Sequence, residues 1–249
     1  EHIILMDAGL SADCLPWNAR QMGISLAGIE AIVLSHGHYD HTGALGTVVS
    51  GAGRQVPLIV HPDAFRFRKL NIPGQGVFDQ PVPDAVALKK AGADIKMRSE
   101  PSALAAGHLL VTGEIERKTA FEKGMPGAEI GREGTWTPDI IRDDQALVMD
   151  VNGKGLVVLS GCAHAGIINT VEYAKKITGI DHVHAVLGGF HLSGKTYEQV
   201  VFPTIEAMKT INPEYLVPMH CTGWSTISRF MAAMPGKCIL NTVGTTYVF

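Results

Sequence analysis

A cluster of metal-ligand side chains constrains this chain more than any other feature of its sequence. The stretch Ser35-His36-Gly37-His38-Tyr39-Asp40-His41-Thr42-Gly43 places three histidines and one aspartate within six residues, directly after the apolar run Ala31-Ile32-Val33-Leu34. That run predicts a buried strand, so the four side chains come at a strand end. Imidazole and carboxylate together suit Zn, Mn or Fe rather than a metal that prefers thiolate.

The spacing of these side chains indicates two metal ions. His36 and His38 alternate, so an extended segment points both side chains to one face, where they can share an ion. Asp40 and His41 follow the start of a turn and can hold a second ion beside the first. The alternative is a polar loop whose histidines cap a helix or bond to the backbone. Four ligand groups in so short a stretch favour the metal site, in which Asp40 could also act catalytically by orienting a water molecule.

Three further histidines each follow an apolar run that predicts a strand. His164 lies in the turn Ser160-Gly161-Cys162-Ala163-His164-Ala165-Gly166, and His191 and His220 follow two later runs. Functional groups of α/β proteins gather at the carboxyl ends of strands. We therefore predict His164 and His220 as metal ligands, and His191 as a ligand or a catalytic contact to the substrate. A simple tight turn is the alternative for the segment that holds His164.

The other patterns predict alternating strands and helices, interrupted by an irregular insertion near residues 62–145 that we interpret as a lid or substrate loop. Within it, Arg66, Arg68 and Lys69 predict either a solvated helix face or an anion site for a phosphorylated substrate. His61 and His108 are interpreted as structural, with a place near the metal as the alternative. The predicted strands include residues 56–60, 109–117, 143–149, 154–159 and 239–242, and the predicted helices include residues 11–23, 43–49, 168–178 and 197–210.

Composition limits the classes of protein that fit. The 249 residues, 46% hydrophobic and 18% charged, can form one sizeable core. A formal net charge of -3 gives no general attraction to nucleic acid or anionic membranes. No apolar run reaches the roughly 18 residues of a membrane helix, and no secretory signal is visible. The four cysteines show no paired spacing, which predicts reduced thiols and a cytoplasmic protein.

Several stretches together resemble one family, the metallo-β-lactamase superfamily. The chain is similar to its dihydropteroate-synthase-like branch, whose members are labelled 7,8-dihydropterin-6-methyl-4-(β-D-ribofuranosyl)aminobenzene-5′-phosphate synthase or metal-dependent hydrolase. The resemblance covers nearly the whole chain and is carried by six motifs at residues 34–45, 112–117 (Thr-Gly-Glu-Ile-Glu-Arg), 143–148 (Asp-Asp-Gln-Ala-Leu-Val), 160–170, 188–192 (Gly-Gly-Phe-His-Leu) and 218–223 (Pro-Met-His-Cys-Thr-Gly).

The resemblance implies an α/β fold of the four-layer αββα type, formed by residues 1–249 as a single domain. It also implies that a first strand precedes Glu1, and that Asp7 forms a turn or supports the site rather than binding metal. His36, His38 and His164 would hold one ion, and Asp40, His41 and His220 the other. Better-known members carry a bridging aspartate where this chain has Ser160-Gly161-Cys162, so either Cys162 lies near the metals or His164 takes over ligation; we favour His164.

The predicted function is that of a binuclear metal-dependent hydrolase, in which metal-activated water acts on a small anionic, phosphorylated substrate. Zinc is the expected metal, with Mn or Fe as alternatives. One alternative activity is a synthase that transfers a dihydropterin group with the same metal site. A nuclease, disfavoured by the low pI, and a non-catalytic metal-binding module are two others. No nucleic-acid or membrane partner is expected, and a homo-oligomer is left open.

Overall fold

Two compact units make up the chain. The structure is a computed structural model that describes residues 2–72, 74–132 and 134–249. Unit 1 comprises Glu1–Ser99 and Met125–Asp143, and unit 2 comprises Glu100–Gly124 and Asp144–Phe249. Compact units are not the same as independently folding domains, so the single domain over residues 1–249 stays a prediction.

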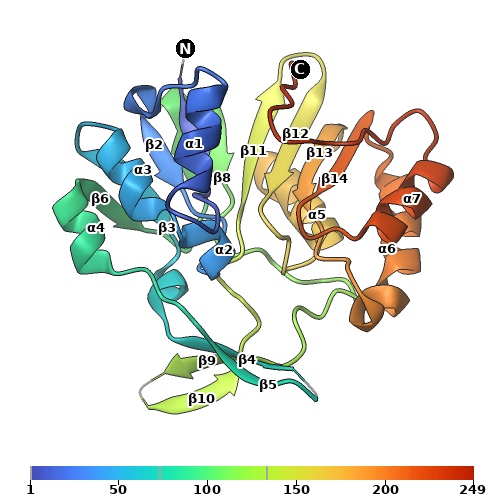
Figure 1. Ribbon diagram of the computed structural model, residues 1–249. Helices are drawn as coiled ribbons and strands as arrows, with labels where there is room; N and C mark the ends of the chain where they lie inside the picture. Colours follow the sequence, from blue (N-terminus) through green and yellow to red (C-terminus); the bar gives the residue numbers. More distant parts are fainter. Residues whose placement is uncertain (1, 73, 133) are drawn as a thin grey trace. The chain divides into compact units, whose positions relative to one another are not determined.

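Unit 1 contains a four-stranded parallel sheet in the order β1-β2-β3-β6. Its strands are β1 (Ile4–Met6), β2 (Ala31–Val33), β3 (Val56–Val60) and β6 (Ala93–Met97). The helices of the unit are α1 (Cys14–Gln21), α2 (Tyr39–Thr42), α3 (Leu45–Gly51) and α4 (Ala85–Ala91) (Figure 1). Apolar side chains of α3 and α4, including Val48 and Leu88, pack with Ile32 and Leu58 of the sheet into one core. The parallel order sends the carboxyl ends of the strands to one edge, where the loop after β2 begins.

A second sheet of unit 1 is antiparallel, in the order β10-β9-β4-β5. It is formed by β4 (Arg68–Ile72), β5 (Gly76–Gln80), β9 (Ala128–Arg132) and β10 (Thr135–Pro138). This sheet corrects one prediction, because Arg68 and Lys69 lie in a strand and not on a solvated helix face. Arg68 is buried, with only 3% of its surface exposed. Period-2 alternation sends Arg68 inward while Lys69 pairs with Glu129 nearer the surface.

Unit 2 is organised around a six-stranded sheet in the order β14-β13-β12-β11-β8-β7, in which β12, β13 and β14 are parallel. The strands are β7 (Ser102–Leu104), β8 (Leu109–Val111), β11 (Ala146–Val151), β12 (Gly155–Ser160), β13 (Val183–Gly189) and β14 (Tyr215–Met219). The helices are α5 (Ile167–Thr178), α6 (Glu198–Ile211) and α7 (Trp224–Ala233) (Figure 1). The strands predicted over residues 143–149 and 154–159 are found as the antiparallel pair β11 and β12.

Both faces of this sheet are covered. Val158 and Val186 pack with the helices in the larger core, which includes Val171 of α5 and Phe230 of α7. Val157 and neighbouring residues point to the other face, because side chains alternate along a strand. There they pack against residues of the C-terminal segment, including Ile239, Tyr247 and Phe249.

Two predicted strands are wrong. The strand expected over residues 109–117 ends at Val111, and residues 112–124 run without strand pairing among the described residues. The segment 239–249 forms no strand either, apart from a single bridge between Leu216 and Cys238 just before it. In both cases the apolar pattern reports burial against the sheet rather than pairing within it. The predicted α/β class is confirmed. Within the described residues, no helix has the length and apolar character needed to cross a membrane.

Candidate metal centre

The loop after β2 holds four predicted ligands close together in unit 1. Nε2 of His36 lies 3.0 Å from Nδ1 of His38, and the His36 ring lies 4.3 Å from that of His41. Nε2 of His41 lies 3.4 Å from a carboxylate oxygen of Asp40 in the first turn of α2. Three imidazoles and a carboxylate therefore present their donor atoms to one small region, as a metal site requires.

Asp7 fixes the orientation of this cluster. Its carboxylate accepts hydrogen bonds from the backbone N–H of Ser35 (2.7 Å) and the Ser35 hydroxyl (2.8 Å). The same carboxylate lies 2.6 Å from Nδ1 of His41, which leaves Nε2 of His41 facing Asp40. Metal-binding histidines usually donate their second ring N–H to a carboxylate in this way. Asp7 adopts φ 62°, an unusual conformation for a residue other than glycine, and supports the site as predicted.

The electrostatics of the loop differ between its histidines. Burial, reinforced by the nearby positive charge of the Arg68 guanidinium, lowers the pKa of His38 to about 4. Burial also opposes a charge on His41, but the Asp7 and Asp40 carboxylates outweigh it and raise the pKa of His41 to about 10. The His41 site thus favours a positive charge, which a proton or a metal ion can supply.

A buried network of ion pairs supports the loop that carries His36 and His38. Arg68 donates from Nε to Asp139 (2.7 Å) and from Nη1 to Asp143 (2.9 Å). Asp143 also accepts the backbone N–H of Gly37 at 2.7 Å, between the two histidines. Burial alone would raise the pKa of Asp143, but Arg68 more than compensates and keeps that pKa below its usual value. Gly37 has no room for a side chain, because a Cβ atom there would lie 2.5 Å from the Ala64 carbonyl oxygen.

Unit 2 supplies three histidines from three adjacent strand ends. His164 follows β12, His191 follows β13 and His220 follows β14, and the parallel strands bring these turns to one edge. The His164 and His191 rings lie 4.1 Å apart. Ala163, His191 and His220 all have positive φ angles, of 54°, 47° and 54°. Non-glycine residues in this conformation cost free energy and cluster at functional sites.

Two thiols lie among these histidines. Sγ of Cys221 accepts the backbone N–H of His191 at 3.3 Å and lies 3.7 Å from the Cys162 carbonyl oxygen. A hydrogen bond with the Cys162 side chain lowers the pKa of the Cys221 thiol, although burial opposes the shift. Burial and the two neighbouring thiols raise the pKa of Tyr197, whose ring lies 4.9 Å from that of His191. Sequence reasoning assigned no role to Cys221 or Tyr197.

Residues 112–124, here called the strap, hold the turn that carries His164. Arg117 donates to the His164 carbonyl oxygen at 2.9 Å. Asn169 accepts the backbone N–H groups of Lys118 and Thr119 and donates to the Ala165 carbonyl. A carboxylate oxygen of Asp144 accepts the Ala165 N–H at 2.8 Å. The strap thus stabilises the turn that carries the predicted ligand His164. In the sequence, its Thr-Gly-Glu-Ile-Glu-Arg motif could have indicated this role.

Glu122 of the strap caps α5 from inside the protein. Its carboxylate accepts the N–H groups of Ile168 and Asn169, both at 2.9 Å, and the Thr119 hydroxyl at 3.0 Å. Burial raises the pKa of Glu122 above its usual 4.5, against the effect of these hydrogen bonds. A carboxylate at a helix N-terminus satisfies otherwise unbonded N–H groups and complements the helix dipole.

Glu122→Gln is expected to change how stability depends on pH. Because the raised pKa means that folded wild type binds the proton more tightly than the unfolded chain does, ionisation of Glu122 lowers the free energy of unfolding as the pH rises above about 4.5. Each unit of raised pKa corresponds to about 1.4 kcal/mol. Urea unfolding of both proteins between pH 4 and pH 8 should show the wild type losing stability relative to the variant. A difference that is constant over this range would contradict the assignment.

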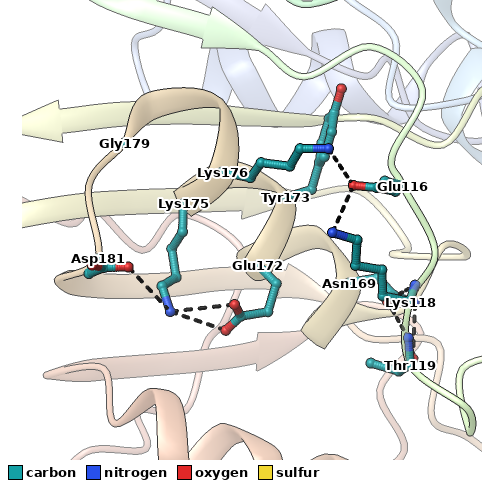
Figure 2. A pocket seen from close by; sticks show the side chains of 10 residues that line it. All are labelled: Glu116, Lys118, Thr119, Asn169, Glu172, Tyr173, Lys175, Lys176, Gly179 and Asp181. Atoms are coloured by element: carbon teal, nitrogen blue, oxygen red, sulfur yellow. Dashed lines mark hydrogen bonds and ion pairs between the residues drawn. The ribbon is translucent and has the colours of Figure 1, made fainter.

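Each unit has a cavity lined by described residues. A cavity of about 460 Å³ in unit 2 is lined by the strap, α5 and the following turn (Figure 2). Figure 2 shows its three lysines paired with carboxylates: Lys176 and Lys118 with Glu116, and Lys175 with Glu172 and Asp181. No predicted ligand lines it. A smaller cavity of about 250 Å³ in unit 1 is lined by Tyr39 and Thr42 of α2 and by residues 81–88, so it adjoins the metal-binding loop.

The structure thus groups the predicted residues into two sets. His36, His38, Asp40 and His41 lie together in unit 1, and His164, His191 and His220 lie on neighbouring turns of unit 2. His61 caps a short helical turn by accepting the Asp63 N–H, which agrees with its interpretation as structural, and the buried His184 pairs with Glu214. The interpretation of Arg68 as part of an anion site is wrong, because its guanidinium forms buried ion pairs with Asp139 and Asp143.

Comparisons with known proteins identify the family. Residues 2–87 match the family described as "Beta-lactamase superfamily domain". A Methanocaldococcus jannaschii protein named 7,8-dihydropterin-6-methyl-4-(beta-D-ribofuranosyl)-aminobenzene-5'-phosphate synthase is 33% identical over 237 residues, covering 92% of this chain and 78% of that protein. MJ0448 of the same organism is 33% identical over 226 residues, covering 91% and 81%. The crystal structure of Tm1679, described as a metal-dependent hydrolase of the beta-lactamase superfamily, is 25% identical with a TM-score of 0.81, covering 97% of this chain and 87% of its own.

Proposed function

This chain belongs to the β-lactamase superfamily, and from that premise we propose that it is a binuclear metal-dependent hydrolase of a small anionic substrate. The family resemblance predicted from the sequence is confirmed, and the names of the relatives indicate an enzyme. The two ions would be held by the six ligands predicted from the sequence: His36, His38, Asp40, His41, His164 and His220. Zinc is the expected metal.

The observation that carries the proposal is the orientation of His41 by Asp7. With Nδ1 held at 2.6 Å by a carboxylate, Nε2 of His41 is directed toward Asp40, whose oxygen lies 3.4 Å away. The contact brings an exposed carboxylate and a buried imidazole together. A divalent cation at this position would satisfy both, and it would replace the proton that the raised pKa of His41 otherwise retains.

Two divalent ions in such a site supply activated water at neutral pH and polarise the bond to be cleaved. The residues of this chain set the conditions for that chemistry. Asp7 and Ser35 orient His41 and His36, and the Arg68 network holds the Gly37 backbone in place. Asp40, with 43% of its side chain exposed, can reach a substrate or a water molecule as a hydrogen-bond acceptor. His191 follows β13, between the strand ends that carry His164 and His220, where it would bind metal or contact the substrate.

An anionic substrate follows from charge. Ions with four positive charges in total attract anions even though the protein carries a net charge of -3. The named relative is a synthase of a 5'-phosphate compound, which makes a phosphorylated substrate the first choice. The same relative supports a second candidate function, a synthase that uses this site to transfer a dihydropterin group. The cavity beside Tyr39 would then receive the non-ionic part of the substrate.

Metal content tests the proposal directly. Protein purified without chelator is expected to contain about two ions per chain by inductively coupled plasma mass spectrometry, with zinc predominant. His38→Ala removes one ligand and should reduce the content by about one ion. His182→Ala is a matched control, because His182 is an exposed histidine whose ring pairs with Glu214. Failure of wild type to bind metal, even after reconstitution, would defeat the proposal.

Substrate class is the second test. The reconstituted protein would be screened with phosphomonoesters, phosphodiesters, lactones and a dihydropterin pyrophosphate. Hydrolysis of a phosphoester would support the hydrolase. Pyrophosphate release that depends on an aromatic amine acceptor would favour the synthase instead.

A further inference from the structure

The strand ends of unit 2 bring together a thiol and two imidazoles. Sγ of Cys162 and one ring nitrogen each of His164 and His191 all lie within 4.8 Å of one another. Cys162 and His164 are buried, at 3% and 2% exposure, and His191 is half-buried. One sulfur and two imidazole nitrogens form a donor set typical of a tetrahedral zinc site with one open position.

We propose that the thiolate of Cys162, together with His164 and His191, ligates one of the metal ions. This inference rests on the proposed function and deepens it, because it adds sulfur to a ligand set otherwise made of nitrogen and oxygen. Cys162 would then take the position at which, by the family resemblance, better-known superfamily members carry a bridging aspartate. A thiolate ligand selects zinc over manganese, which prefers oxygen donors.

The backbone is shaped to make this convergence. Ala163, which lies between Cys162 and His164, and His191 itself both adopt the left-handed conformation that non-glycine residues rarely use. Gly189 lies beside the thiols, where an added Cβ atom would come 2.7 Å from Sγ of Cys221 and 3.2 Å from Cα of Cys162. Strained residues and a tightly enclosed glycine at the same place indicate a site whose geometry is built, since neither is needed to end a strand.

One buried ring nitrogen of the cluster lies where it could bind a cation. Among the residues that the structure describes, Nδ1 of His191 is buried and has no hydrogen-bond partner. Such a group costs free energy unless something satisfies it, and a bound cation would do so. Cys221 has a different role, because its sulfur already accepts the backbone N–H of His191. We therefore assign Cys162 as the ligand and Cys221 as a positioning residue.

Cobalt spectroscopy tests the assignment without an activity assay. The full chain would be stripped with a chelator and reconstituted with Co(II), because a thiolate ligand gives an intense near-ultraviolet charge-transfer band that nitrogen and oxygen ligands do not. Wild type is expected to show this band. Cys162→Ser should lose it and bind cobalt at least about tenfold more weakly, whereas Cys221→Ser and Cys238→Ser should keep it.

The other outcomes separate this inference from the proposed function. Two bound cobalt ions without the band would overturn the thiolate ligand and leave the hydrolase proposal standing. A protein that binds no metal would overturn both. A band that survives in Cys162→Ser and disappears in Cys221→Ser would overturn the assignment to Cys162. If Cys162→Ser does not fold by circular dichroism, X-ray absorption of zinc-loaded wild type decides, since a Zn–S distance of about 2.3 Å must then be present.

Discussion

Replacing Asp40 with alanine is expected to lower kcat by about 10³-fold or more while leaving the fold intact, because under the proposed function the variant would lose an ion ligand at the substrate site. Asp40 lies in the first turn of α2 with 43% of its side chain exposed, so its removal empties no core. The prediction is measured as turnover of whichever phosphoester the screen identifies, with metal content determined in parallel. Asp40→Ala should also bind fewer ions than wild type.

Asp94→Ala provides the matched control. Asp94 is an aspartate of the same unit with 38% of its side chain exposed and an ion pair to Lys96 in the same strand. It changes the net charge by the same amount without touching the metal-binding loop, so its kcat should equal that of wild type. Asp40→Ala with wild-type turnover and two bound ions would rule out the two-metal mechanism.

The largest effect on stability is expected from Asp143→Ala, which should lower the free energy of unfolding by about 3–5 kcal/mol. The variant leaves the Arg68 guanidinium buried with one of its two carboxylate partners removed. It also removes the acceptor of the Gly37 N–H, which Asp143 binds at 2.7 Å. Breaking a buried pair is costly because the remaining charge cannot return to water. Urea unfolding followed by circular dichroism measures the loss.

A surface pair in the same sheet serves as the control. Lys69 and Glu129 join neighbouring strands β4 and β9 at 3.0 Å but remain partly exposed, so Glu129→Ala should cost only about 0–1 kcal/mol. The double variant Arg68→Met with Asp143→Asn should lose less than the sum of the two single changes, since it removes both charges together. Strict additivity would show that the network is not coupled.

The sequence by itself determined the class of fold and led to the proposed chemistry. Both follow from local patterns: apolar runs predict strands, and the segments that follow these strands carry His36, His38, Asp40, His164 and His220. Side-chain periodicity needs only a few neighbouring residues, so the boundaries of β3 and α5 came out within one residue of the prediction. The family resemblance depended on motifs of the same local kind.

Only the tertiary structure decided which groups support these ligands. The local sequence suggests that Arg68 is an exposed cation. In the folded chain it is buried and bonded to Asp139 and Asp143, which lie 71 and 75 residues away in sequence. The contact of Cys162 with Cys221 likewise joins turns that lie 59 residues apart. Such pairings depend on how distant segments pack, because burial turns a solvated charge into a group that must be neutralised and a free thiol into a candidate ligand. No local pattern contains that information.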